Sequence, residues 1–234
     1  MHMPKIAVDI DDTLYSFDAV AKDALFHLAQ ERGDMSILQA AYTESLQWRT
    51  PADVAGLETW MEAIEIAHRP EVIEQQPPYP GAAETLQALV ENGHELMYIS
   101  NRDEEAQEAT MGWLIANGFP MDYDGLPNLK CLHGDKIPHL RDCQYIIDDR
   151  VSTLVRFVTD YAWKQWYGSE GRPDKVRRAF GIHHPHNTNL TDLEKIYLAP
   201  SWAGLNHYMV GKGLLKEPAY EPFGHLKEKD TIHA

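Results

Sequence analysis

The chain begins with a short apolar run that gives way to acidic side chains. Residues 5–8 are mainly apolar, and Asp9, Asp11 and Asp12 follow within four positions. Such a run predicts a buried strand, and α/β proteins bind ligands at the carboxyl ends of parallel strands. Clustered carboxylates repel one another and cost free energy to desolvate, so the grouping indicates a bound cation, a shared proton or both. The structural alternative is that Asp12 or Thr13 caps the next helix.

Helical periodicity follows this strand. Residues 17–31, 37–46 and 57–68 each place apolar side chains at helical spacing, and Pro70 closes the last of them. No β-branched strand interrupts the series. We therefore expect a small helical subdomain inserted into an α/β core, with residues 75–81 as its exit linker.

From residue 81 the pattern alternates between helix and strand. Three stretches with helical periodicity alternate with three apolar runs of strand length, and residues 136–142 are expected as a turn or short helix. The predicted helices are 81–92, 104–117 and 151–162, and the predicted strands are 94–99, 128–133 and 144–147. Repeated strand-helix units predict a parallel sheet with right-handed crossovers.

The predicted strands end in polar side chains. Because the carboxyl ends of parallel strands share one edge of the sheet, these side chains and a lysine in a nearby loop are expected to meet there. In chain order they are Asp9, Asp11, Ser100, Asn101, Lys136, Asp148 and Asp149. Four carboxylates, a hydroxyl and an ammonium at one edge predict a site for a hard divalent cation such as Mg²⁺.

Mg²⁺ commonly binds one or two carboxylates together with phosphate oxygens, so the site points to phosphoryl chemistry. Asp9 is the candidate nucleophile, which would form an aspartyl-phosphate. Asp11 is the candidate acid and base. Ser100 and Lys136 would hold and neutralise the phosphoryl oxygens.

These residues resemble the four motifs of the haloacid dehalogenase-like (HAD) superfamily of phosphohydrolases. The motifs are Asp9 to Thr13, Ser100, Lys136 and the Asp148–Asp149 pair, in the family's order over residues 5–160. The resemblance implies Asp9 as nucleophile and Asp11 as acid and base. It also implies Mg²⁺ bound by Asp9, the main-chain carbonyl of Asp11 and Asp148 or Asp149. The dehalogenases lack the second acid, so that activity is disfavoured.

The resemblance also implies a fold and a domain division. The fold is α/β, a Rossmann-like parallel sheet with an inserted helical cap of the C1 type. Residues 1–14 and 80–210 would form the core and residues 15–79 the cap. Residues 211–234 read as an irregular tail, and the pattern leaves open whether it wraps the core or serves an oligomer contact such as a homodimer.

Within the superfamily the chain is most similar to the 5′(3′)-deoxyribonucleotidases. Shorter similarities carry this resemblance: Phe17, residues 79–81, His186 with Asn187, and residues 201–205. It implies that Phe17 faces a nucleobase, with Trp48 or Trp60 completing a stacking wall. Core packing is the alternative for Phe17, since it lies on the apolar face of a helix.

Two triplets depart from the nucleotidase pattern. Ser100-Asn101-Arg102 and Asp148-Asp149-Arg150 look like the phosphatase part of polynucleotide kinase-phosphatases, and Asp12-Thr13 stands where the nucleotidases usually have Gly-Val. Asn101 and Arg102 are therefore candidate substrate-binding residues. The substrate alternatives are a nucleoside monophosphate and a polynucleotide 3′ or 5′ end. A non-catalytic nucleotide- or phosphate-binding protein is the alternative of another class.

Composition narrows the partners. The 234 residues carry a formal charge of −15, which disfavours duplex nucleic acid and anionic membranes as partners. A small phosphorylated substrate is compatible with that charge, because a bound metal reverses the local field. No stretch reaches the roughly 20 apolar residues of a membrane span. Cys131 and Cys143 read as reduced thiols of a cytoplasmic protein, with a single bridge as the lesser alternative.

Two further clusters of charged or titratable residues each have two interpretations. The histidines from His183 to His186 invite a metal-site interpretation, but they lack the matched partners of a structural zinc site. The basic run from Arg172 to Arg178 reads most simply as a solvated loop and helix start, with contact to a longer anionic substrate as the alternative.

Overall fold

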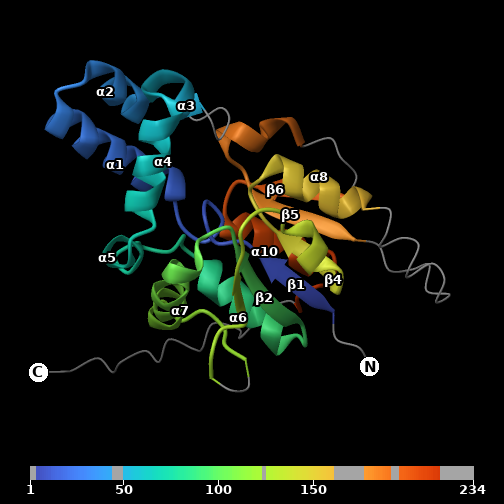
Figure 1. The fold of residues 1–234 in the computed structure, drawn as a ribbon. Coiled ribbons are helices and arrows are strands. Elements are labelled where there is room, and N and C mark those ends of the chain that lie inside the picture. The colour runs from blue at the N-terminus through green and yellow to red at the C-terminus, as the bar shows by residue number, and fades with distance from the viewer. Residues whose placement is uncertain (1–3, 44–49, 123–124, 161–176, 191–194, 217–234) are drawn as a thin grey trace, which may run out of the picture.

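The computed structural model describes residues 4–43, 50–122, 125–160, 177–190 and 195–216 (Figure 1). Its centre is one sheet in the order β3-β2-β1-β4-β5-β6, and all pairings between these strands are parallel. The strands are β1 (Lys5–Val8), β2 (Glu95–Ser100), β3 (Leu129–Cys131), β4 (Cys143–Ile147), β5 (Arg178–Ile182) and β6 (Ile196–Ala199). The predicted α/β class and parallel sheet are confirmed.

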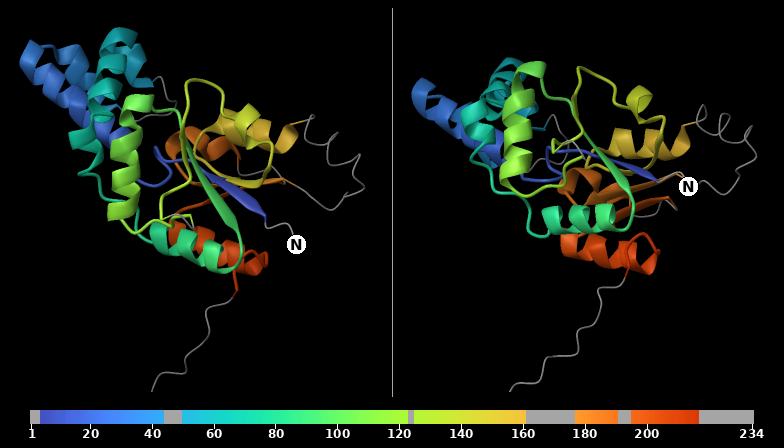
Figure 2. Two further views of the ribbon diagram at one scale, coloured as in Figure 1. Left: turned by 60° about the horizontal axis from the view of Figure 1, so that its bottom comes forward. Right: turned by 90° about the horizontal axis from the view of Figure 1, so that it is seen from below.

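Helices cover both faces of the sheet (Figure 2). They are α6 (Ala82–Glu91), α7 (Gln107–Ala116), α8 (Val151–Thr159) and α10 (Trp202–Gly211), with short 3₁₀ turns at Glu104–Ala106, Ile137–Leu140 and Pro185–Leu190. Side chains alternate across a strand, so Ile6 and Val8 of β1 join one core with α6, α7 and α10. Ala7 joins a second core with α8.

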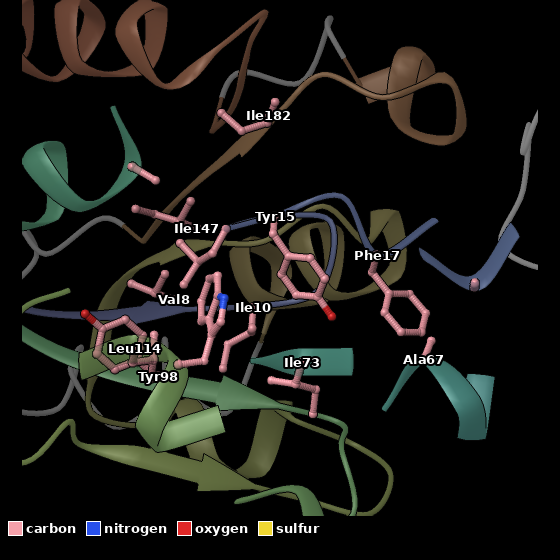
Figure 3. Packing of buried hydrophobic residues seen from close by; sticks show 14 of the residues in the cluster. Val8, Ile10, Tyr15, Phe17, Ala67, Ile73, Tyr98, Leu114, Ile147 and Ile182 are labelled. Carbon is pink, nitrogen blue, oxygen red and sulfur yellow. The ribbon is translucent and has the colours of Figure 1, made fainter. Parts of the chain in front are cut away.

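Between β1 and α6, the described residues form five helices. They are α1 (Phe17–Arg32), α2 (Met35–Tyr42), α3 (Thr50–Ala55), α4 (Leu57–Ala67) and α5 (Pro70–Ile73). Figure 1 shows α1 to α4 grouped beyond the edge of the α/β layers. Their apolar faces continue the core of the sheet, and Figure 3 shows Phe17 of α1 beside Ala67 of α4. The three predicted helices are found here, although residues 44–46 of the second lie outside the described part.

None of the helices formed by the described residues is long and apolar enough to cross a membrane. Both cysteines are free thiols: Cys143 is buried and Cys131 is half-buried.

The last two strands were not predicted, and β5 overturns the interpretation of the basic run. Arg178 begins β5, where a helix start was expected. Arg177 is buried, with its guanidinium donating to Asp160 Oδ2 (3.0 Å) and to the Leu140 carbonyl (2.7 Å). Its Cζ also lies 4.4 Å from the centre of the Phe157 ring. The charge of Arg177 therefore supports the fold and is not solvated. The run's residues up to 176 lie outside the described part.

The loop after β1 is held by residues distant in sequence. The main-chain oxygen of Leu14 accepts from Tyr79 N (2.7 Å), and that of Thr13 accepts from Trp202 Nε1 (2.9 Å). Asp12 has a φ of 55° and accepts from the amide of Asp18 in the first turn of α1 (2.9 Å). The N-cap residue of α1 is Ser16, so the expectation that Asp12 or Thr13 occupies that position is wrong, although the Asp12 carboxylate does bind a first-turn amide. The carboxylates of Asp9 and Asp11 instead accept hydrogen bonds from the charged side chains of Lys136 and Arg102.

Gly181 of β5 allows a close approach to the end of β4. A Cβ at this position would collide with the main-chain oxygen of Asp148 and press on Leu198. We expect Gly181→Ala to destabilise the protein by about 1–3 kcal/mol through overpacking and to lower activity by displacing Asp148. Gly112→Ala is the control, because nothing lies near a Cβ there and helix α7 should gain about 0.5–1 kcal/mol. Denaturant unfolding measures both, and equal stability of the two variants would contradict the close approach.

Candidate active site

Three carboxylates meet at the carboxyl ends of β1 and β4. Asp9, Asp148 and Asp149 each place an oxygen within 4.8 Å of the others. Lys136, at the start of the 3₁₀ turn after β3, donates from Nζ to Asp9 Oδ1 (2.5 Å) and to Asp148 Oδ2 (3.3 Å). Asp148 is fully buried, and Asp9 and Lys136 are almost so. The site therefore holds more negative than positive charge in a setting with little solvent.

Burial and charge decide the protonation of this cluster. Burial raises the pKa of Asp9 well above its usual range, and the Lys136 ammonium only partly offsets that effect. The pKa of Asp148 is raised for the same reasons. Burial lowers the pKa of Lys136, but Asp148 and Asp9 outweigh burial, so Lys136 stays charged. One ammonium does not neutralise three carboxylates, and the all-oxygen donor set suits a hard divalent cation.

Asp11 faces a different set of partners. Its Oδ1 accepts from Arg102 Nη2 (2.7 Å) and from the Tyr15 hydroxyl (2.8 Å), and its Oδ2 accepts from Ser100 Oγ (3.2 Å). His68, just after α4, brings its Nε2 to 3.6 Å from Oδ2. Burial raises the pKa of Asp11, but Arg102 and His68 outweigh burial and bring that pKa well below its usual range. These contacts favour the carboxylate form of Asp11.

Asp149 is held from the loop after β5. Its Oδ2 lies 2.7 Å from His186 Nε2, and its main-chain oxygen accepts from Asn187 Nδ2 (3.1 Å). Burial raises the pKa of Asp149, but the His186 hydrogen bond helps to bring it below its usual range. His184 lies 2.6 Å from the Asp12 carbonyl, and its ring stacks on that of His186. These histidines hold the loops around the acids, and they are absent from the one acidic metal cluster found among the described residues.

A cavity of about 710 Å³ opens above these groups, between the sheet edge and helices α1, α4 and α5. It is lined on the sheet side by Asp9, Asp11, Asn101, Lys136 and Asp149 and on the helical side by Phe17, Met61, Ile64, His68 and Pro70, with further charged residues at both sides. The volume falls within the range of roughly 300–1,000 Å³ typical of small-molecule sites.

The other predicted binding residues differ in whether they line the cavity. Phe17 lines the cavity but is 5% exposed, with the His68 ring stacked on it at 4.7 Å. Asn101 also lines the cavity, whereas Arg102 is fully buried beneath it. Trp60 is buried in the core of the helical segment and is not brought to the cavity. Trp48 lies outside the described residues.

Sequence reasoning did not find several residues that hold this site. Tyr15, His68 and Thr110 carry no motif of their own, because their partners lie on other elements of the fold. His186 and Asn187 did carry a signal, since they were among the short nucleotidase similarities, but their contact with Asp149 depends on the unpredicted strand β5.

A family comparison agrees with the sheet and its acidic strand ends. The model of the haloacid dehalogenase-like hydrolase family matches residues 5–113, which include β1, helices α1 to α6, the whole of β2 and part of α7. The parallel six-strand sheet agrees with that family. The chain therefore resembles the haloacid dehalogenase-like hydrolases over a little less than half of its length, and this resemblance indicates an enzyme.

Two curated relatives carry the name "Putative nucleotidase". One, OB0422 from Oceanobacillus iheyensis, is 29% identical over 158 residues, which cover 65% of this chain and 80% of that protein. The other, from Bacillus cereus, is 37% identical over 87 residues, which cover 35% of this chain and 43% of that protein.

Solved structures share the fold. A HAD family hydrolase from Deinococcus radiodurans, with bound phosphate and sodium, gives a TM-score of 0.57 at 18% identity and covers 92% of this chain and 99% of its own. A haloacid dehalogenase-like protein from Agrobacterium tumefaciens gives 0.53 at 13% identity, with 91% and 100% covered. At these identities the likeness shows the fold alone.

Proposed function

We propose that this protein is a Mg²⁺-dependent phosphatase that acts through an aspartyl-phosphate at Asp9, with a nucleoside monophosphate as substrate. The observation that carries the proposal is the position of Asp9: it lines the cavity, against Lys136 and beside the buried Asp148 and the half-buried Asp149. Among the described residues, no hydrogen-bond donor is seen at Asp9 Oδ2, so that oxygen is available for attack on phosphorus.

Asp9, Asp148 and Asp149 would hold Mg²⁺, with the main-chain carbonyl of Asp11 as a further ligand. The fit rests on three clustered carboxylates whose charge the single Lys136 ammonium does not neutralise. When bound, the ion neutralises phosphate oxygens and lowers the repulsion between the substrate and the carboxylates.

The first step forms a bond between Asp9 Oδ2 and phosphorus while the bond from phosphorus to the leaving oxygen breaks. Lys136 keeps Asp9 in place through its hydrogen bond to Oδ1 and supplies positive charge beside the phosphoryl group. Asp11 gives a proton to the leaving oxygen, which departs as an alcohol.

The second step releases phosphate. The Asp11 carboxylate takes a proton from water as the water oxygen bonds to phosphorus, and the bond from phosphorus to Asp9 breaks. The Arg102 guanidinium keeps the pKa of Asp11 low enough for this role as a base. The proton gained here is the one that Asp11 delivers in the next turnover.

The helical segment would select the substrate. We place the cap at residues 15–79 over a core of residues 1–14 and 80–210, with the nucleobase against the cap wall. That wall combines the Phe17 and His68 rings with Met61 and Ile64. Because His68 covers one face of Phe17, the base would meet this stacked pair and not Phe17 alone. The names of the two relatives support a nucleotide as the substrate.

A screen of phosphorylated compounds tests the substrate class. It should compare ribo- and deoxyribonucleoside 5′- and 3′-monophosphates, short oligonucleotides with terminal phosphates, sugar phosphates and an aryl phosphate. We expect the highest kcat/KM with a nucleoside monophosphate. Preference for oligonucleotides would favour the polynucleotide-end alternative, and no turnover of any compound with Mg²⁺ would favour a non-catalytic binding protein.

Removal of the metal tests the carboxylate site directly. Treatment with EDTA should bring turnover to background, and Mg²⁺ should restore it. At a concentration 100 times Kd, Mg²⁺ should also raise the free energy of unfolding by about 2.7 kcal/mol. The melting temperature of the protein should rise accordingly. Asp148→Asn should weaken that thermal shift. An equal shift in both proteins would place the metal elsewhere.

A further inference from the structure

Arg102 is a buried charge at the end of β2, next to the cavity-lining Asn101. Its side chain has no exposed surface, so it cannot bind a substrate in this arrangement. An arginine stays charged in a protein, and a buried one must satisfy its donors within the fold. Its partners are the Asp11 carboxylate and the hydroxyls of Tyr15 and Thr110.

The two oxygens of Asp11 are held differently. Oδ1 accepts two short hydrogen bonds, from Arg102 Nη2 (2.7 Å) and from the Tyr15 hydroxyl (2.8 Å). Arg102 Nε lies 3.3 Å from both oxygens. Oδ2 has longer contacts, 3.2 Å to Ser100 Oγ and 3.6 Å to His68 Nε2. Asp11 lines the cavity, so Oδ2 is the oxygen left to exchange a proton with a molecule bound there.

Arg102 is itself fixed from the opposite side. Its Nη1 donates to Thr110 Oγ1 on α7 (2.6 Å), and that hydroxyl donates to the Ala106 carbonyl (2.7 Å). Its Nη2 also donates to the Tyr15 hydroxyl (2.8 Å), which in turn donates to Asp11. A continuous chain of hydrogen bonds therefore links α7 to the Asp11 carboxylate.

We propose that Arg102 is a positioning residue that, together with Tyr15, fixes Oδ1 of Asp11 so that Oδ2 carries the transferred proton. This inference rests on the proposed function. In the first step the bond from Oδ2 to hydrogen breaks and the proton goes to the leaving oxygen. In the second step a water proton goes to Oδ2. Arg102 acts through Asp11, which replaces the substrate-binding role that the resemblance implied for it.

The dependence of the rate on the leaving group distinguishes a positioning role of Arg102 from a substrate-binding role. The alkoxide leaving group of an alkyl phosphate needs a proton on its oxygen, whereas the phenolate leaving group of an aryl phosphate departs without one. We expect Asp11→Asn to lower kcat/KM for an alkyl phosphate by about 10²–10⁴-fold and for an aryl phosphate by at least about tenfold less. Arg102→Met should also lower kcat/KM more for the alkyl phosphate than for the aryl phosphate. The double variant should be no slower than Asp11→Asn alone, because both changes remove one function.

A substrate-binding Arg102 gives another pattern. KM would then rise equally for both phosphates, and the losses of the two single variants would multiply in the double variant. Either result would overturn the inference. A wild-type protein that hydrolyses neither phosphate with Mg²⁺ would instead overturn the proposed function.

Thr110→Val keeps the test informative if Arg102→Met does not fold. It removes the outer hydrogen bond of Arg102 together with the bond from the Thr110 hydroxyl to the Ala106 carbonyl, and it leaves Arg102 and Asp11 in place. We expect a loss of about two- to tenfold in kcat/KM that is larger for the alkyl phosphate. Thr85→Val is the control, because Thr85 is a buried threonine of α6 whose hydroxyl bonds Asn206 away from the cavity. Equal losses for both phosphates in Thr110→Val would also overturn the inference.

Discussion

Asp9→Asn should abolish turnover. An amide cannot attack phosphorus as a carboxylate does, so we expect a loss on the order of 10⁴-fold or more. The fold should persist, because burial already raises the pKa of Asp9 and an uncharged side chain relieves repulsion within the acidic cluster. The measurement is kcat with an aryl phosphate, together with the melting temperature.

Asp23→Asn is the matched control for that variant. It makes the same chemical change at an exposed position on α1, and we expect full activity. Appreciable turnover by Asp9→Asn would show that another group attacks phosphorus.

Lys136→Met should have the second largest effect, on stability as well as activity. It leaves Asp9 and Asp148 buried without their shared cation, and breaking a buried pair in this way costs about 3–5 kcal/mol. Lys5→Met is the control, because its ion pair with Glu95 is partly exposed and worth about 0–1 kcal/mol. Urea unfolding measures both.

The loss in Lys136→Met should depend on pH and on metal. Without the ammonium, burial raises the pKa values of Asp9 and Asp148 still further above those of the unfolded chain. The folded state then binds more protons than the unfolded state, so stability rises as the pH falls through the folded values. Mg²⁺ should restore part of the stability at neutral pH. A loss independent of both pH and Mg²⁺ would show that Lys136 contributes by packing.

The strand ends could be predicted because local sequence determines them. An apolar run that stops at Asp9 or Asp148 specifies a buried strand and its polar end without reference to the rest of the chain. Parallel topology then brings the ends together, as the contacts of Lys136 with Asp9 and Asp148 show.

The remaining features depend on contacts that local sequence does not encode. Arg102 looked like a substrate ligand because of its neighbours in the sequence, but the side chain turns toward Thr110 and Asp11. Arg177 looked solvated within a basic run, but partners 17 and 37 residues away bury it. His68 reaches Asp11 only because α4 and the loop after β1 fold against each other.

The position of the phosphoryl group on the protein tests the central claim most directly. Asp11→Asn should be mixed with an aryl phosphate and Mg²⁺ and quenched in acid, because this variant still forms the intermediate and hydrolyses it slowly. Peptide mass spectrometry should then find phosphate on Asp9, and the Asp9→Asn protein should carry none. Turnover by wild-type protein with phosphate on another residue, or with none trapped on Asp9 of the Asp11→Asn protein, would contradict an aspartyl-phosphate at Asp9.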